Sequence, residues 1–174
     1  MAAFIVLSIL VQSKATQEFD HSVILYFQSI AGNPVLDTAM WAITEIGSVI
    51  WLTIFSIVLL IIRKTRRIGL VMLLCLVAGT IGSGYFKGYV IDHPRPALEF
   101  LGTQFPYKIG EDTFVLGTNG SFPSGHATRA AVVTMIAGYA LSHRFPKGRY
   151  LLWIFPVLES ISRLYVLQHH PMDV

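Results

Sequence analysis

Apolar stretches separated by short polar links recur along the chain and predict several membrane-spanning helices. A helix that crosses a bilayer needs roughly 17–25 mostly apolar residues. Two stretches reach that length, and two shorter ones approach it. The predicted spans cover residues 46–62 (with 34–45 as an extension), 68–86, 127–141 (lengthened if 124–126 join) and 150–161.

Two of these spans contain polar or small residues that are informative in a membrane helix. Near the end of residues 68–86, a group of glycines and a serine indicates close packing between helices. In the last span, Glu159 is a carboxylate, which is costly inside a membrane and often functional there. A position at the membrane interface is the alternative for Glu159, and the sequence leaves both open.

The first thirty residues predict shorter helices. Residues 1–11 are apolar but too short to cross a bilayer, and no basic residue precedes them as a signal peptide would require. We therefore expect a short or incomplete first membrane helix. Residues 18–30 place apolar side chains at near-helical spacing, which predicts a helix in the membrane interface, with an ordinary loop helix as the alternative.

Composition narrows the class of protein. Of the 174 residues, 53% are hydrophobic and 13% are charged, whereas soluble domains carry about 25% charged residues. These values exclude a disordered chain, a nucleic-acid-binding module and an ordinary soluble enzyme. The length is that of one domain, and a single cysteine allows no internal disulfide. We expect an all-α, polytopic transmembrane bundle of about five to six helices, in which residues 1–174 form one membrane-embedded domain.

Basic residues predict the orientation of the chain in the cell membrane. They gather in two short links, one between the first two long spans and one between the last two. These residues are Arg63, Lys64, Arg66 and Arg67 in the first link, and Arg144, Lys147 and Arg149 in the second. The positive-inside rule places both links in the cytoplasm. Residues 87–124 and 162–174 then lie on the extracytoplasmic side.

Polar residues form three clusters at the predicted extracytoplasmic helix ends. In the first cluster, Lys87 ends a predicted span and Arg95 follows between two prolines. Lysine supplies a point charge and arginine a planar fork, a combination that suits a phosphate group. The alternative is a lysine that snorkels to the interface and an ordinary surface arginine.

The second cluster, residues 121–126, has the features of a helix start, with Ser124 just before the predicted helix. Free N–H groups at a helix N-terminus bind anions, and Gly125 allows a ligand to approach the main chain closely. His126 is a candidate proton donor near neutral pH. The alternative is a capped helix with a surface histidine.

The third cluster follows the last span and includes Arg163, His169 and Asp173. His169 and Asp173 are four residues apart and would share one face of a helix. A carboxylate bonded to one imidazole nitrogen fixes the tautomer and leaves the other nitrogen as a nucleophile. A metal site is the alternative, but three basic groups and a helix N-terminus favour an anion over a cation.

In this order, the three clusters resemble the signature of the type-2 phosphatidic acid phosphatase superfamily. That signature is a lysine ahead of Arg-Pro, then Pro-Ser-Gly-His, then Ser-Arg, five residues, His, three residues and Asp. Residues 123–126 match the central motif in full. The third motif is matched at the family spacing by Ser162, Arg163, His169 and Asp173. The motifs extend over residues 87–173.

The resemblance implies a role for each matching residue. His169 would be the nucleophile that forms a phosphohistidine, Asp173 would orient it, and His126 would protonate the leaving oxygen and then help to activate water. The residues implied to hold the phosphoryl oxygens are Lys87, Arg95, Ser124, Gly125 and Arg163. The family uses no metal for phosphate hydrolysis, and we expect no cofactor.

The chain departs from the family pattern in two places. Seven residues separate Lys87 from Arg95 where the family usually has six, and a bulge at the helix end would absorb the extra residue. The family's membrane members usually have a further span after the final aspartate, whereas this sequence ends one residue after Asp173. We therefore expect an extended version of the chain to be more stable and more active.

The resemblance implies hydrolysis of a lipid monophosphate or diphosphate on the extracytoplasmic face. Candidates are polyprenyl diphosphate, which we favour, phosphatidylglycerophosphate, phosphatidic acid and lipid A phosphates. The expected partners are this substrate and membrane lipids, without nucleic acid, and the sequence does not set the oligomeric state. The loop of residues 97–120, with Tyr107, Lys108, Glu111 and Asp112, either contacts the head group or is a solvated connector.

Two other functions remain open at the level of the sequence. A lipid phosphotransferase would use the same phosphohistidine but pass the phosphoryl group to a lipid acceptor. A non-enzymatic membrane transporter or scaffold would use the basic clusters only to bind phosphate.

Overall fold

The computed structural model describes residues 2–91, 93–96 and 120–174, with side chains from residue 4 onward. Regular structure in these ranges is helical, with one isolated bridge between Pro94 and Gly120, which confirms the expected all-α fold. The elements are α1 (Ala2–Gln12), α2 (Gln17–Ile30), α3 (Pro34–Ile46), α4 (Val49–Ile61), α5 (Arg66–Tyr85), the π-helical turn η1 (Phe86–Val90), α7 (Gly125–Ala140), the 3-10 helix η3 (Gly148–Trp153), α8 (Ile154–Tyr165) and the 3-10 turn η4 (Pro171–Asp173).

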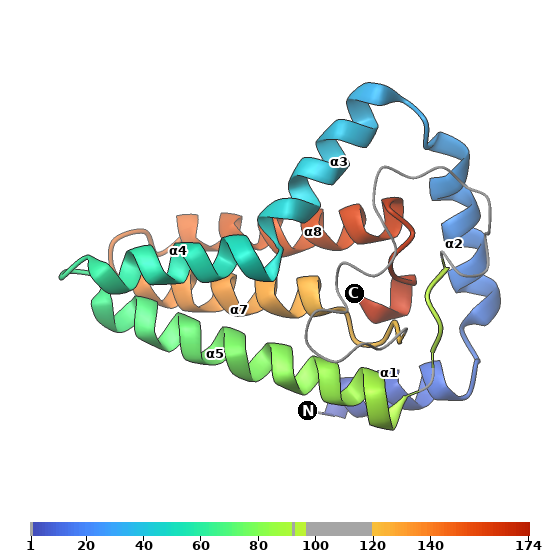
Figure 1. Cartoon of the computed structure of the whole chain (residues 1–174), viewed down its shortest axis with the longest axis horizontal. Helices are drawn as coiled ribbons and strands as arrows, with labels where there is room; N and C mark the ends of the chain where they lie inside the picture. The colour runs from blue at the N-terminus through green and yellow to red at the C-terminus, as the bar shows by residue number, and fades with distance from the viewer. Residues whose placement is uncertain (1, 92, 97–119) are drawn as a thin grey trace.

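Four helices, α4, α5, α7 and α8, run side by side along the long axis of the molecule (Figure 1). A core of Leu52, Met72, Leu76 and Val133 joins α4, α5 and α7, and Phe155 of α8 packs against it. The short helices α1 and α2 lie together at one end of this bundle. Burial of these apolar side chains holds the helices in fixed positions, so that the polar residues at the helix ends have a rigid support.

The predicted first long span is broken in the structure. The helices α3 and α4 meet at an angle of 49°. The break lies at Gly47 and Ser48, and the Ser48 side chain starts α4 by accepting a hydrogen bond from the Trp51 main-chain N–H at 3.4 Å. A serine at an N-cap favours a new helix start over continuation of the preceding helix.

The number of membrane crossings stays a prediction. Within the described part of the chain, one helical segment is long and apolar enough to cross a bilayer, Arg66–Val90, or two if α3 and α4 form one bent span. The helices α7 and α8 have 16 and 12 residues. The first helix, α1, has only 11, as expected for a short segment.

The predicted last span, residues 150–161, is helical throughout but is divided between two elements. Residues 148–153 form a 3-10 helix, and α8 begins at Ile154 and continues through Arg163 to Tyr165. The start has a physical reason, because Pro156 lacks a main-chain N–H and is tolerated only in the first turn of an α-helix. Because α8 ends only at Tyr165, Arg163 lies on the helix and not in a loop after it.

The predicted helix over residues 18–30 is confirmed as α2. It packs beside the end of the chain, where the Met172 main-chain N–H donates to the Asp20 carboxylate at 3.2 Å. The ring of Phe27 meets that of Tyr165 edge to face, and the Tyr165 hydroxyl donates to Asp37 of α3. These contacts fix the C-terminal end of α8 against α2 and α3.

Close packing of α4 on α5 depends on Gly69. A Cβ at this position would lie 2.7 Å from the main-chain carbonyl oxygen of Ser56 and from the carbonyl carbon of Leu59, both in α4. Main-chain atoms cannot move aside without separating the helices, so Gly69→Ala should destabilise the fold by about 1–3 kcal/mol.

The matched control is Gly82→Ala on the same helix, where a Cβ would meet no atom within 4 Å. That change should be neutral or stabilising by up to about 1 kcal/mol, since alanine favours a helix over glycine. Thermal unfolding in detergent micelles compares the two variants. Equal melting temperatures for both would contradict the packing interpretation.

Candidate active site

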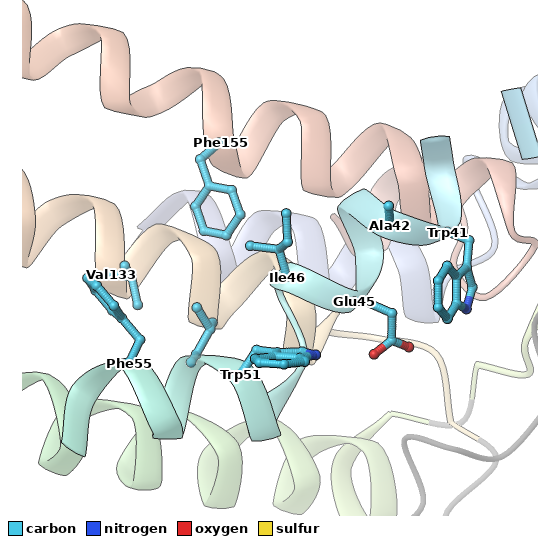
Figure 2. A pocket seen from close by; sticks show the side chains of 9 residues that line it. Trp41, Ala42, Glu45, Ile46, Trp51, Phe55, Val133 and Phe155 are labelled. Carbon is cyan, nitrogen blue, oxygen red and sulfur yellow. The ribbon is translucent and has the colours of Figure 1, made fainter. Parts of the chain in front are cut away.

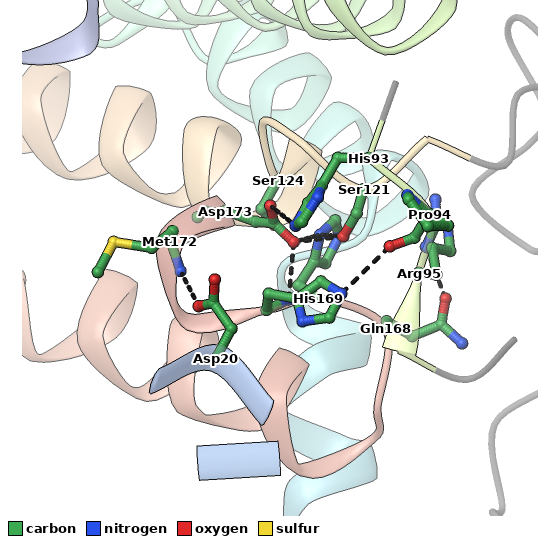
Figure 3. A network of polar contacts seen from close by, with 12 residues as sticks. Asp20, His93, Pro94, Arg95, Ser121, Ser124, Gln168, His169, Met172 and Asp173 are labelled. Atoms are coloured by element: carbon green, nitrogen blue, oxygen red, sulfur yellow. Dashed lines mark hydrogen bonds and ion pairs between the residues drawn. The ribbon is translucent and has the colours of Figure 1, made fainter. Parts of the chain in front are cut away.

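The three polar clusters meet at one end of the bundle (Figures 1 and 3). Arg95 of the first cluster donates from Nη1 to the Gln168 side-chain oxygen at 2.6 Å, which joins it to the third. Ser124 of the second cluster donates its main-chain N–H to the Asp173 carbonyl at 2.8 Å. Segments far apart in sequence therefore form one site.

The two basic links lie at the other end of the bundle. Figure 1 shows the connections from α4 to α5 and from α7 to η3 together, opposite the ends that form the site. The seven lysines and arginines that predict a cytoplasmic location lie in these connections and at the starts of α5 and η3 that follow them. The structure thus separates the positive links from the candidate site along the long axis of the molecule.

A π-helical turn lies where the segment between Lys87 and Arg95 begins. This turn, η1, follows α5 directly and contains Lys87. A π-helical turn accommodates one more residue than the α-helix it interrupts, which is the kind of bulge that the spacing requires. Lys87 is partly exposed, whereas Arg95 is 2% exposed.

His169 and Asp173 are in contact, although not in the way the sequence predicted. We expected a shared helix, but His169 lies in the irregular segment between α8 and η4. Its Nδ1 atom is 3.5 Å from Asp173 Oδ2 and 3.3 Å from the Ser121 hydroxyl oxygen. The bend at Pro171, which starts η4, folds the carboxylate back toward the imidazole ring.

The Asp173 carboxylate is held by several groups (Figure 3). Its Oδ2 atom accepts hydrogen bonds from the Ser121 hydroxyl and from the His170 main-chain N–H, the latter at 2.7 Å, and His93 Nε2 lies 3.7 Å from Oδ1. Burial raises the pKa of Asp173 from 3.8 to about 7, because desolvation disfavours the charged form more than these donors stabilise it.

His170, the neighbour of His169, has a different environment. Its Nε2 atom faces the Pro94 carbonyl oxygen at 3.2 Å, and its ring lies 4.6 Å from that of His93. Burial and the charge of His93 lower the pKa of His170 to about 4, so the ring is neutral at physiological pH. Of the two adjacent histidines, His169 is the one whose ring faces Asp173.

The second cluster starts α7 as expected. Ser124 is the N-cap, and its side-chain oxygen accepts from the Ala127 main-chain N–H at 3.4 Å. Gly125 is the first helical residue, and His126 follows with only 1% of its surface exposed. The positive end of the helix dipole therefore points into the site.

Several residues that contact the predicted site were missed from the sequence. They are Thr44, whose hydroxyl accepts from the fully buried, predicted Arg163 at 3.0 Å, Gln168, which accepts from Arg95, and Arg129, which approaches His126 Nδ1 at 3.2 Å. An arginine within an apolar span, three residues after a histidine, was a usable signal for Arg129. Gln168 and Thr44 carried no comparable signal.

Glu159 is fully buried in the structure. Its carboxylate packs so closely on Gly47 that a Cβ there would overlap it. Its depth in the membrane, within the span or near the interface, stays a prediction.

An apolar pocket of about 780 Å³ lies beside the break between α3 and α4 (Figure 2). Trp41 and Ile46 of α3, Trp51 and Phe55 of α4, and Phe155 of α8 line it. Thr44, which bonds Arg163, precedes the pocket residue Glu45 directly in the chain. The stretch of α3 that lines the pocket therefore also contributes Thr44 to the bond with Arg163.

The predicted loop lies outside the part of the chain that the structure describes, whereas the metal alternative can be compared with it. Tyr107, Lys108, Glu111 and Asp112 belong to residues 97–119, outside the described residues. For the metal alternative, the described part of the chain contains no group of three or more His, Cys, Asp or Glu side chains arranged to hold a metal ion.

This chain belongs to the PAP2 superfamily, since the superfamily's sequence profile matches residues 68–174. The chain is 30% identical over 129 residues to an undecaprenyl-diphosphatase of Sulfolobus acidocaldarius, covering 72% of this chain and 55% of that protein. It is 30% identical over 154 residues to the undecaprenyl-diphosphatase BcrC of Bacillus subtilis, covering 85% of this chain and 72% of BcrC. The chain thus spans about half the length of the archaeal relative.

A solved structure gives the same fold. The transmembrane PAP2-type phosphatidylglycerolphosphate phosphatase of Bacillus subtilis superposes with a TM-score of 0.77 at 26% identity, over 99% of this chain and 84% of that one. The family predicted from the three motifs is therefore confirmed.

Proposed function

We propose that the protein is an integral-membrane lipid phosphatase that works through a phosphohistidine at His169. One observation carries this proposal: the buried His169 ring directs Nδ1 toward Asp173 and Ser121. A carboxylate at Nδ1 holds the imidazole in one tautomer and stabilises the positive charge that develops when Nε2 attacks phosphorus. The names of the relatives, which are phosphatases, support the same class of reaction.

The phosphate would be held by Lys87, Arg95 and Arg163 and by the start of α7. The Ser124 main-chain N–H already donates to Asp173, and its hydroxyl oxygen accepts from Ala127. The Ser124 hydroxyl therefore contributes through its O–H, and Gly125 contributes through its main-chain N–H. Phosphoryl transfer needs positioning and charge stabilisation above all, and buried arginines supply both.

The reaction would proceed in two displacements. In the first, His169 Nε2 forms a bond to phosphorus, the bond to the leaving oxygen breaks, and His126 donates a proton to that oxygen. In the second, His126 takes a proton from a water molecule, whose oxygen replaces His169 on phosphorus. Inorganic phosphate leaves, and both histidines return to their starting states.

The substrate would be a lipid phosphate or diphosphate, with a polyprenyl diphosphate favoured, bound from the extracytoplasmic leaflet. The opposed positions of the basic links and the site support this orientation. The apolar pocket beside α3 and α4 would receive the lipid tail while the head group reaches Arg163. Relatives named as undecaprenyl-diphosphatases support the choice of lipid.

Phosphate release from a panel of lipid phosphates in detergent micelles, with and without vanadate, tests this function. The panel includes long-chain and water-soluble short-chain versions of each head group. We expect vanadate-sensitive release that is faster for the long chains. Release from none of the lipids would contradict the proposal, and transfer of the phosphate to a second lipid would identify a phosphotransferase.

The pH dependence of kcat/KM should follow the ionisation of the Asp173 carboxyl group. Because burial raises its pKa to about 7, Asp173 is protonated below pH 7 and becomes the carboxylate that His169 requires above it. The kcat/KM value should therefore rise with pH up to about 7 and then level off. Asp173→Asn should remove this acidic limb and lower the rate, and a limb that persists in the variant would belong to another group.

A further inference from the structure

Arg129 lies in the interior of α7, one turn after His126, and is 6% exposed. A permanently charged side chain at such a position in an apolar helix is costly and marks a functional site by default. Neither the motifs of the sequence nor the proposed mechanism gives Arg129 a role. Its contacts indicate one.

Three elements fix the guanidinium group of Arg129. Its Nη2 atom lies 3.2 Å from His126 Nδ1, and its Nε donates to the Gly47 carbonyl at the end of α3 at 3.4 Å. Its Nη1 atom lies 3.0 Å from the point that a Cβ of Gly125 would occupy, so the glycine leaves room for it. The carboxyl group of Glu159 in α8 packs on the same Gly47 and is fully buried.

The direction of the hydrogen bond to His126 follows from chemistry. A guanidinium group has only donors, so Nδ1 of His126 must accept. A neutral imidazole that accepts at Nδ1 carries its proton at Nε2. Arg129 therefore selects one tautomer of His126 and, through its positive charge, polarises the Nε2–H bond.

We propose that Arg129 is a positioning residue that holds His126 with its proton on Nε2, directed at the leaving oxygen. The role of His126 as the donor rests on the proposed function, whereas the tautomer does not. Through this N–H group His126 would donate its proton to the leaving oxygen, and the charge of Arg129 beside Nδ1 would stabilise the ring after the proton has left. This help matters more for an alkoxide than for a phosphate leaving group, because the alkoxide is the stronger base.

The tautomer can be measured without any activity. The full chain is labelled with ¹⁵N-histidine in detergent micelles, and the His126 signals are assigned by their loss in His126→Gln. At a pH where the ring is neutral, we expect the proton on Nε2 in the wild type and in Arg129→Lys, and a mixture of tautomers in Arg129→Met. Arg144→Met, a change at an exposed arginine, is the control and should leave the signals unchanged. A wild-type proton on Nδ1, or an unchanged tautomer in Arg129→Met, would overturn the proposal.

Kinetics test the coupling of the two residues. Arg129→Met should lower kcat about 10²-fold with little change in KM, more for lipid monophosphates than for diphosphates, and Arg129→Lys should restore part of the rate. Combined with His126→Ala, Arg129→Met should cause no further loss. Multiplicative losses in the double variant would show that Arg129 acts apart from His126. A wild type without phosphatase activity would refute the proposed function and leave the tautomer result standing.

Discussion

His169→Ala should lose phosphatase turnover by a factor on the order of 10⁶ while the protein stays folded. The imidazole supplies the atom that bonds to phosphorus, and no neighbouring group replaces it in the described site. His169 is buried beside Asp173 and Ser121. Phosphate release from the preferred lipid, measured beside a thermal unfolding curve, separates a lost nucleophile from a lost fold.

The matched control is His170→Ala at the adjacent position. The His170 ring faces the Pro94 carbonyl and the His93 ring, whereas the Asp173 carboxylate faces the ring of His169. His170→Ala should therefore lower the rate far less than His169→Ala does. Substantial activity in His169→Ala, or equal losses in both variants, would contradict the choice of nucleophile.

His126→Ala should slow turnover by roughly 10²–10⁴-fold, the usual contribution of a general acid or base. The loss should depend on the leaving group, because a weakly basic leaving group needs little help from a proton donor. A substrate with a diphosphate bond or a nitrophenolate leaving group should therefore suffer least. Steady-state kinetics on both kinds of substrate measure the difference.

His143→Ala is the control for this variant, since His143 is an exposed histidine in the link after α7. The turnover rate of His143→Ala should match that of the wild type on every substrate. Near-normal rates in His126→Ala, or a loss that does not vary with the leaving group, would remove His126 from proton transfer.

Local chemistry explains which features the sequence predicted well. The start of α7 at Gly125 follows from the Ser124 cap, an interaction between residues three apart. The family spacing chose His169 over His170, and the contact between His169 and Asp173 agrees with that choice. The bulge required between Lys87 and Arg95 is found as the π-helical turn η1.

The features that the sequence did not predict depend on contacts between distant segments. Arg163 bonds Thr44, 119 residues earlier, and Arg95 bonds Gln168, 73 residues later. Such pairs form only after the helices pack, so hydropathy and local motifs carry no signal for them. The expected helix joining His169 and Asp173 was wrong because Pro171 starts a separate 3-10 turn after an irregular segment.

Trapping the covalent intermediate tests the central proposal most directly. The protein is mixed with lipid phosphate carrying ³²P in the transferred group, quenched in alkali, digested, and its labelled peptide identified. We predict acid-labile, alkali-stable label on the peptide that contains His169, absent from His169→Ala and retained in His170→Ala. Rapid lipid hydrolysis with label on another residue, or with no labelled protein at any time of quenching, would contradict a phosphohistidine at His169.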